Sequence, residues 1–406
     1  MLRLRDATPN QRHTLLAAAL GWMLDAFDTL LYALVLTHIM RDLGMSKSTG
    51  GLLNTLTLLA SGAGGLLFGF LADRIGRKRA LMLSIVTYSV CSFASGLSTS
   101  ILMLAVFRFI LGLGMGGEWN TGAALVAETW PAQLRAKALA IVQSSWAIGY
   151  ALAALVAGVV LQFANWRAVF FVGILPALLT LWIQKDVNES ELWKEQQVTK
   201  ATLGSFREIF QPQYLRSTLA LLFLNFFCLF AWWGLFTWIP PYLSLPIEQG
   251  GRGFGVMETT TLLLVLNLAG MLPGYLSFGW VADALGRRKA FALYTLIAAI
   301  LVPVYAIARQ PVTLLVVGTV LAFFGTGYFS GSGLIGSEIF PTNVRARALG
   351  FTYNGARAMS CIAPFVIGSL GQARGLNSAF FLCAGSFLLA TFCATLLPET
   401  KGKTLA

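Results

Sequence analysis

A succession of long apolar stretches restricts the fold of this chain more than any other feature. The stretches are about 20 to 28 residues long, and a helix of that length, rising about 1.5 Å per residue, crosses a hydrocarbon core of roughly 30 Å. Of the 406 residues, 57% are hydrophobic and 11% are charged, whereas soluble domains carry about 25% charged residues. A spanning segment must satisfy its own backbone hydrogen bonds in lipid. The sequence therefore predicts an all-α membrane protein.

Charged residues and Gly/Pro breaks divide the apolar sequence into twelve predicted transmembrane helices. They are expected at roughly 14–40, 47–73, 79–98, 101–128, 137–163, 167–184, 215–245, 258–283, 289–308, 312–339, 347–372 and 376–397. The longest polar stretch, 185–214, separates the first six spans from the last six. We therefore expect an N-terminal six-helix bundle over 1–184, a cytoplasmic linker over 185–214, and a C-terminal six-helix bundle over 215–406.

The distribution of basic residues predicts the orientation of these spans. If both termini are cytoplasmic, twenty-one of the 29 Lys and Arg residues lie in cytoplasmic segments and six lie outside. This bias predicts that both ends face the cytoplasm of a bacterial-type inner membrane. Topology and lipid headgroups then explain the net charge of +12 better than nucleic-acid binding does. The first apolar run contains Asp25 and Asp28 and is too long for a cleaved signal, so we interpret it as a retained span.

Residues for soluble catalysis are not evident in the sequence. The five cysteines lie inside apolar stretches and show no paired spacing, so neither disulfides nor a metal site is expected. The sequence shows no nucleotide-binding loop, nucleophile triad or soluble catalytic domain. We therefore expect neither an enzyme nor an ATP-driven pump, and no cofactor.

The two halves contain the same charged motif 210 residues apart. The segment GFLADRIGRK, which begins at Gly69, is matched by GWVADALGRR, which begins at Gly279. Two further sets of residues repeat at the same offset: Glu128, Pro131 and Arg135 with Glu338, Pro341 and Arg345, and Glu189-Ser190 with Glu399-Thr400. Three matches at one offset indicate duplicated units in parallel orientation.

These motifs resemble those of a known family. Gly69-x-Leu-Ala-Asp73-Arg-x-Gly76-Arg77-Lys78 is similar to the loop motif of the major facilitator superfamily, and Arg108-x-x-x-Gly112-x-Gly114 resembles its fourth-span motif. Four shorter segments, 24–28, 116–119, 166–176 and 351–354, are similar to the sialate:proton symporters and their monocarboxylate relatives. The aromatic acid:proton symporters share the paired aspartates of the first span. The resemblance implies the major facilitator fold of two pseudo-symmetric six-helix bundles.

Charged residues at the predicted cytoplasmic ends of the spans are candidates for a gating latch. The expected pairs are Asp73 with Arg77, Asp283 with Arg287, Glu128 with Arg135, and Glu338 with Arg345. An exposed contact of this kind contributes about 0.3 to 1 kcal/mol, which biases one of two conformations. The resemblance implies that the latch holds the cytoplasmic side closed while the outer side is open. Alternatively, the basic residues only enforce the topology.

Five ionisable residues lie deep within predicted spans: Asp25, Asp28, Arg108, Glu118 and Arg357. Each costs at least about 2.5 to 3.5 kcal/mol at the bilayer centre unless it is paired or hydrated, so function is the default explanation. None of them has an ionisable counterpart 210 residues away. Structural repeats keep packing residues in both copies, so this asymmetry favours a functional role.

The chemistry of these five residues suggests two roles. Asp25, Asp28 and Glu118 are candidate proton carriers, because a carboxyl in a low-dielectric cavity readily holds a proton. Arg357 is the first candidate for contact with a substrate anion and Arg108 the second, because a planar guanidinium suits a carboxylate. Alternatively, Arg108 tunes Glu118 or Asp28, as in similar proton-coupled carriers, or the charges form purely structural ion pairs.

Aromatic and amide side chains within the spans complete the candidate site. Trp233 and its aromatic neighbours on the seventh predicted span would suit a sugar ring or an aromatic acid, and an interfacial belt explains them equally well. Tyr353, Asn354 and Gln143 would hydrogen-bond a polyhydroxylated substrate, or they bridge helices.

Together these features predict a secondary active transporter that imports an organic carboxylate by proton symport through alternating access. The carboxylate is sialate-like, a monocarboxylate or an aromatic acid. The alternatives are a proton-coupled exporter, a sugar-type facilitator of the same fold, and a non-transporting membrane receptor. We expect a monomer whose partners are a small organic anion, a proton and membrane lipid.

Overall fold

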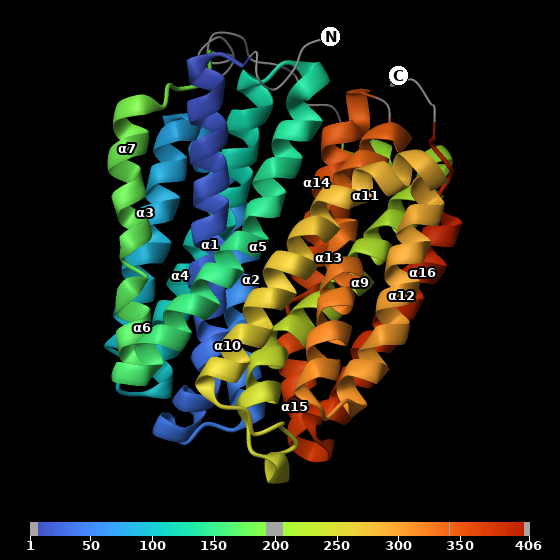
Figure 1. Cartoon of the computed structure of the whole chain (residues 1–406). Helices are drawn as coiled ribbons and strands as arrows, with labels where there is room; N and C mark the ends of the chain where they lie inside the picture. The colour runs from blue at the N-terminus through green and yellow to red at the C-terminus, as the bar shows by residue number, and fades with distance from the viewer. Residues whose placement is uncertain (1–6, 192–205, 341, 402–406) are drawn as a thin grey trace. The chain divides into compact units, whose positions relative to one another are not determined.

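The computed structural model describes residues 7–191, 206–340 and 342–401, and these ranges contain helices and no strand (Figure 1). Within the helices, the side chains of residues 120, 132, 133, 135, 136, 206, 207 and 342–347 are not described. The predicted all-α class is confirmed for the described part of the chain. The helices group into two compact units.

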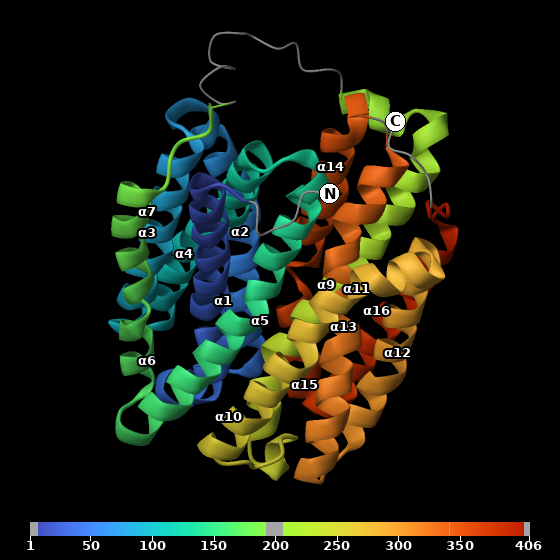
Figure 2. The same ribbon diagram turned by 45° about the horizontal axis from the view of Figure 1, so that its top comes forward.

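The first unit contains the helices of the N-terminal half, apart from Lys47–Leu52, and also includes Val256–Thr260. Its helices are α1 (Pro9–Leu43), α2 (Lys47–Ile75), α3 (Arg77–Gly96), α4 (Ile101–Thr129), α5 (Ala132–Phe163), α6 (Trp166–Val172) and α7 (Leu179–Asp186). Figure 2 shows α1 between α4 and α5, and it packs along both. α3 packs along α4. The neighbours of α1 therefore bring side chains from α3, α4 and α5 to its surface.

The second unit contains the helices of the C-terminal half, apart from Val256–Thr260, and also includes Lys47–Leu52. Its helices are α9 (Pro212–Ser244), α10 (Val256–Val265), α11 (Leu272–Leu285), α12 (Arg287–Ile307), α13 (Pro311–Ile339), α14 (Thr342–Ser360), α15 (Ala363–Arg374) and α16 (Leu376–Leu396). Three short helical turns accompany them: Phe206–Phe210, Ile247–Gln249 and a π-helical turn, Leu266–Met271, between α10 and α11. α9 packs along α14 and α16, and α12 packs along α13 and α16.

Helix boundaries repeat at the offset of 210 residues that the sequence predicts. α4 begins at Ile101 and ends at Thr129, and its counterpart α13 begins at Pro311 and ends at Ile339. α3 and α12 begin at Arg77 and Arg287. These helix ends therefore follow the 210-residue repeat of the sequence.

Ten helical segments in the described ranges are long and apolar enough to cross a membrane, so the count of twelve spans stays a proposal. The two remaining predicted spans, 79–98 and 347–372, correspond to α3 and to the pair α14 and α15. α3 begins with three basic residues at 77–79, which lowers its mean hydropathy. α14 also carries arginines, and it ends at Ser360 before α15 begins at Ala363. Polar content and a helix break explain the difference.

Large apolar side chains are exposed along both units. Leu66 is 79% exposed and Phe163 is 85% exposed in the first unit, and Trp280 is 76% exposed in the second. Exposure of so much apolar surface is unfavourable in water and favourable in lipid. The helices therefore suit an integral membrane protein.

Candidate functional site

Four of the five predicted buried ionisable residues lie together in the first unit. Asp25 and Asp28 are three residues apart on α1 and so lie on the same side of the helix, while Arg108 and Glu118 lie on α4, which packs against α1. All four residues are at most 1% exposed. Their charges interact in sequence, from Glu118 to Asp25, then to Asp28 and to Arg108. We call these four residues the ionisable column.

Asp28 is held in place by α3. The Ser92 hydroxyl donates a hydrogen bond of 2.8 Å to Asp28 Oδ1. Gly173, at the end of α6, lies so close that a Cβ atom there would collide with Ser92 Oγ and Asp28 Oδ1. The other oxygen, Asp28 Oδ2, has no hydrogen-bond partner among the described residues. One carboxyl oxygen is thus fixed, and the other is left for a proton or a ligand.

Arg108 is a fully buried cation beside Asp28. Its guanidinium carbon lies 4.5 Å from the centroid of the Tyr32 ring on α1, a cation–π geometry. None of its three side-chain nitrogens has a hydrogen-bond acceptor within the part of the chain that the structure describes. A guanidinium has five N–H donors, and burying them unsatisfied is costly. An anion or a water molecule would remove this cost.

Glu118 lies at the other end of the column. Its carboxyl occupies the α1–α4 interface, where a Cβ atom on Gly21 would overlap Glu118 Oε1. Neither of its oxygens has a hydrogen-bond partner in the described ranges. A buried carboxyl in this state is far less costly when it carries a proton. Glu118 is therefore chemically suited to binding a proton.

The other predicted substrate contacts on α14 lie in the second unit. Arg357 is 8% exposed, and Tyr353, one turn earlier on the helix, is close enough for the two side chains to interact electrostatically. Asn354 is exposed. The structure thus brings the buried Arg357 and the partly buried Tyr353 together and leaves Asn354 exposed.

Gln143 and Trp233 belong to different units. Gln143 lies on α5 of the first unit and is 9% exposed. Trp233 lies on α9 of the second unit, where its ring centroid is 4.9 Å from that of Trp232 in an edge-to-face contact. Because Trp233 is buried, its position argues against the interfacial-belt interpretation.

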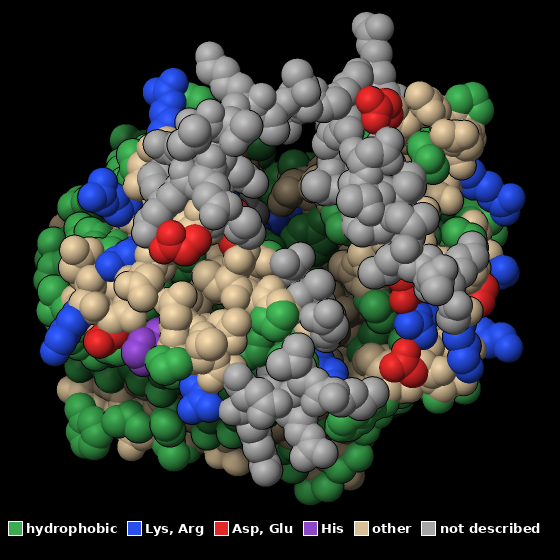
Figure 3. Space-filling view, turned by 90° about the horizontal axis from the view of Figure 1, so that it is seen from above, with side chains coloured by type: hydrophobic (Ala, Val, Ile, Leu, Met, Phe, Trp, Pro, Cys, Tyr) green, Lys and Arg blue, Asp and Glu red, His purple; other side chains and the backbone are tan. Residues whose placement is uncertain are grey.

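Charged side chains lie at one end of the helices, which Figure 3 shows from above. In the first unit, Arg77 Nη1 lies 2.5 Å from Asp73 and Arg77 Nη2 lies 3.2 Å from Glu128. Glu189 follows α7 and accepts hydrogen bonds of 2.9 and 3.2 Å from the backbone N–H groups of the first two residues of α3. Gly76, the residue before α3, has no side chain that could cap the helix. Glu189 therefore supplies the N-cap acceptor.

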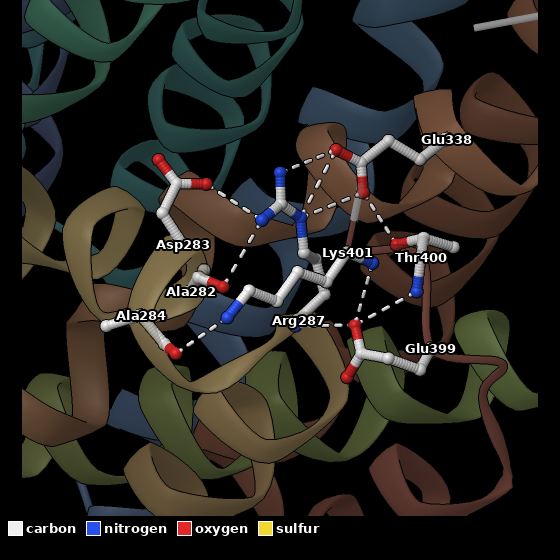
Figure 4. A network of polar contacts seen from close by, with 8 residues as sticks. All are labelled: Ala282, Asp283, Ala284, Arg287, Glu338, Glu399, Thr400 and Lys401. Carbon is white, nitrogen blue, oxygen red and sulfur yellow. Dashed lines mark hydrogen bonds and ion pairs between the residues drawn. The ribbon is translucent and has the colours of Figure 1, made fainter. Parts of the chain in front are cut away.

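The second unit repeats this cluster 210 residues later, as Figure 4 shows. Arg287 lies 2.7 Å from Asp283 and 2.9 Å from Glu338. The Glu399 carboxyl accepts a hydrogen bond of 2.9 Å from the backbone N–H of Arg287 at the start of α12. It accepts two more from the backbone N–H groups of Thr400 and Lys401, the two residues that follow Glu399. The Thr400 hydroxyl donates a bond of 2.6 Å to Glu338. This contact ties the segment after α16 to the end of α13.

We name these clusters the first clasp and the second clasp. The first consists of Asp73, Arg77, Glu128 and Glu189, and the second of Asp283, Arg287, Glu338 and Glu399. The sequence predicts pairs of Glu128 with Arg135 and of Glu338 with Arg345. The side chains of the two arginines lie outside the described residues, so these two pairs stay predictions. Sequence reasoning missed the capping role of Glu189 and Glu399, although both appear in the 210-residue repeat.

Hydrogen bonding in the second clasp alters the acidity of Glu399. Partial desolvation raises its pKa, but hydrogen bonds from the backbone N–H groups of Lys401, Arg287, Thr400 and Arg288 outweigh this effect. The pKa of Glu399 is therefore lowered from its ordinary value. The charged form that results also complements the positive N-terminal end of α12.

Comparison with known proteins provides the family of the chain. The model of the Major Facilitator Superfamily matches residues 16–272 and 251–405. A probable 4-methylmuconolactone transporter of Cupriavidus pinatubonensis (strain JMP 134 / LMG 1197) is 33% identical over 98% of this chain and 93% of that protein. A sialic acid transporter of Escherichia coli (strain K12) is 33% identical over 94% of this chain and 93% of that protein.

A solved structure shows the same fold. The xylose transporter of E. coli in a partially occluded inward-open conformation matches with a TM-score of 0.78 at 18% identity, over 98% of this chain and 100% of that one. The relatives are transport proteins, so the chain is a member of a transporter family and not an enzyme. The sequence motifs, the family model and these relatives agree, and the chain belongs to the Major Facilitator Superfamily.

Proposed function

We propose that this protein imports an organic carboxylate together with a proton by alternating access. It acts as a monomer in the bacterial inner membrane, with both termini in the cytoplasm. Its twelve transmembrane helices form two six-helix bundles, 1–184 and 215–406, joined by a cytoplasmic linker over 185–214. The relatives named for transport of 4-methylmuconolactone and of sialic acid support a small organic solute.

The observation that carries this proposal is the buried guanidinium of Arg108 beside Asp28. The guanidinium has no hydrogen-bond acceptor in the described part of the chain. A substrate carboxylate fits its donors in a bidentate geometry. While Asp28 is charged, it competes with that carboxylate for the cation, and a proton on Asp28 ends the competition. Proton and substrate therefore favour each other's binding, which symport requires.

Asp25 and Glu118 provide further proton positions in the same column. Both are buried, and their charges interact with each other. Asp25 and Glu118 are therefore additional proposed positions for the transported proton within the α1–α4 interface. One proton moving with one monoanion is electrically neutral, and each further proton adds about 2.3 kcal/mol per 100 mV of membrane potential.

Arg357 is the second proposed contact with the substrate anion, because it is buried on α14 and lies near Tyr353. Its planar donors would hold a carboxylate in the same way as those of Arg108. The remaining proposed contacts are hydrogen-bonding or aromatic side chains: Tyr353, Asn354, Gln143 and Trp233.

The two clasps are the proposed gating latch. Each clasp joins the ends of three helices within its own unit, and each arginine is about nine-tenths buried, with 11% exposure for Arg77 and 12% for Arg287. Partly buried ion pairs of this kind are screened less by salt than exposed ones. In the proposed latch, making or breaking one clasp shifts the balance between two conformations of the transporter. Arg135 and Arg345 stay proposed members of this latch.

Uptake into proteoliposomes under an inward proton gradient tests the proposal. We expect uphill accumulation of at least one of labelled benzoate, lactate and sialate. Arg108→Ala and Arg357→Ala should each reduce accumulation by about tenfold or more, because a hydrogen bond to a charged group contributes roughly 1.5 to 3 kcal/mol. Arg374→Ala, at an exposed position, is the control and should transport normally.

A proton-site variant completes the test. Asp28→Asn should still exchange labelled substrate down its gradient, because the amide leaves Arg108 available, but it should lose uphill accumulation. Normal accumulation in Arg108→Ala, Arg357→Ala and Asp28→Asn would refute the assignment of the site. Proton-for-solute exchange without uphill uptake by the wild type would instead support an exporter.

A further inference from the structure

Three tryptophans from three helices pack together in the first unit. They are Trp22 on α1, Trp119 on α4 and Trp146 on α5. The ring centroid of Trp22 lies 4.6 Å from that of Trp119 and 4.7 Å from that of Trp146, with 46° between the planes in both pairs. Trp22 and Trp146 are 5% and 4% exposed, while Trp119 is only partly buried. Trp119 is therefore the accessible face of this cluster, which we call the tryptophan triad.

The triad adjoins the carboxyl end of the ionisable column. Trp22 lies three residues before Asp25, on the same side of α1, and Trp119 directly follows Glu118. The Glu118 carboxyl lies against Gly21, the residue before Trp22. Aromatic faces and proton-binding carboxyls are thus neighbours in one helix interface.

The indole N–H of Trp22 is buried and has no hydrogen-bond acceptor among the described residues of the unit. Buried indole N–H groups usually find an acceptor, and leaving one unpaired costs free energy. An acceptor supplied by a bound solute would remove that cost.

The second unit shows what packing alone requires at these positions. Trp232 and Phe329 lie 210 residues after Trp22 and Trp119, and their rings also touch, with centroids 5.8 Å apart. At the position equivalent to Trp146, however, the second unit has Ala356. An aromatic pair therefore belongs to the shared helix packing. The third indole and the neighbouring carboxyls occur in the first unit only.

We propose that the tryptophan triad binds the flat face of a conjugated or aromatic ring and makes this transporter selective for planar unsaturated acids over saturated acids of the same size. This inference rests on the proposed function and narrows its substrate class. A planar ring can stack on the accessible Trp119, whereas a puckered saturated ring meets the same indole with fewer atoms in contact. Stacking of this kind changes affinity by about two- to tenfold.

Benzoate and cyclohexanecarboxylate provide the matched pair of substrates, because each is a six-carbon ring with one carboxylate. Their half-saturating concentrations for uptake are compared in proteoliposomes under an inward proton gradient. In the wild type, the half-saturating concentration of benzoate should be about two- to tenfold lower than that of cyclohexanecarboxylate. Trp119→Leu should bring the ratio close to one with cyclohexanecarboxylate uptake retained, whereas Trp119→Phe should preserve a preference for benzoate.

Two further variants control for effects on folding and packing. Phe329→Leu changes the equivalent position of the second unit and should leave the preference unchanged. Trp146→Ala introduces alanine, which the second unit has at the equivalent position, so we expect the variant to fold. It should weaken the preference for benzoate, because Trp22 loses the ring that packs against it. If Trp119→Leu does not fold, Trp146→Ala and Trp119→Phe decide the question.

The outcomes separate this inference from the proposed function. Equal half-saturating concentrations for both acids in the wild type, or an undiminished preference in Trp119→Leu or Trp146→Ala, would overturn the inference while leaving proton-coupled carboxylate import intact. Absence of uphill uptake for every carboxylate offered would overturn the proposed function, and the inference with it.

Discussion

Replacing Glu399 by alanine tests how the segment after α16 stabilises the second unit. The Glu399 carboxyl accepts a hydrogen bond of 2.9 Å from the first N–H group of α12. The preceding residue, Gly286, has a φ of 97° and provides no side-chain cap. A Cβ atom on Gly286 would also approach Glu399 Oε2 to 2.5 Å. The glycine therefore makes room for the carboxylate, and the carboxylate caps the helix from a distant part of the chain.

The size of the effect follows from the capping geometry. Losing an N-cap acceptor costs about 0.5 to 2 kcal/mol. Glu399 is exposed on one side, so solvent screens its charge, and we expect a loss of about 1 kcal/mol at neutral pH. For a unit of roughly 200 residues, this loss lowers the midpoint of thermal unfolding by about 2 to 4 °C.

The pH dependence separates the charged cap from other effects of the substitution. The pKa of Glu399 is lowered in the folded state, so its contribution is complete above the unfolded-state pKa of about 4.3 and is lost as the pH falls through the folded-state value. The wild type and Glu399→Ala should therefore differ at neutral pH and converge well below about pH 4.

Thermal unfolding of the purified protein in detergent, followed by tryptophan fluorescence, measures this difference. Glu248→Ala removes an exposed glutamate outside both clasps and should leave the midpoint unchanged. Glu189→Ala removes the equivalent cap of the first unit and should act by a similar amount. Equal stability of the wild type and Glu399→Ala at neutral pH would refute the capping argument, as would a difference that persists undiminished in acid.

Other substitutions test the column and the clasps. Gly173→Ala should destabilise the protein by about 1 to 3 kcal/mol, because the added methyl group collides with Ser92 and Asp28, and an unchanged thermal midpoint would contradict this. Ser92→Ala should lower the half-saturating substrate concentration by about three- to tenfold, because the Ser92 hydroxyl donates to Asp28 and favours the charged form that competes with the substrate; uptake kinetics measure the change. Glu338→Gln should lower the midpoint of thermal unfolding and leave the ratio of accumulated to external substrate unchanged. Glu118→Gln should abolish uphill accumulation. Loss of accumulation in Glu338→Gln together with normal accumulation in Glu118→Gln would count against the clasp role of Glu338 and the proton-binding role of Glu118.

The helical architecture could be predicted because hydrophobic length and the repeat both leave direct marks in the sequence. A chain of apolar stretches has few alternatives to spanning helices. The 210-residue offset places equivalent helix ends at equivalent residues, such as Arg77 and Arg287. The break between Ser360 and Ala363 could not be predicted in the same way, since the apolar pattern continues across it.

The candidate site could be predicted in its residues but not in its contacts. Asp25, Asp28, Arg108 and Glu118 are conspicuous as charges within apolar sequence. The Ser92 bond to Asp28 depends on how α3 packs, and a serine in a span has no unusual signal. The tryptophan triad joins residues up to 124 positions apart, so only the packing of α1, α4 and α5 reveals it. Long-range contacts of this kind require the folded structure.

The difference between the two units separates the needs of the fold from the needs of transport. The clasps occur in both units, so nothing about them is particular to one half of the chain. At the positions of Asp25 and Glu118, the second unit has Leu235 and Tyr328, which are both fully buried. A bundle built on the same helix plan therefore packs without these carboxyls. Since buried charges are costly and packing does not demand them, their presence in the first unit supports the proposal that they bind a proton and an anion.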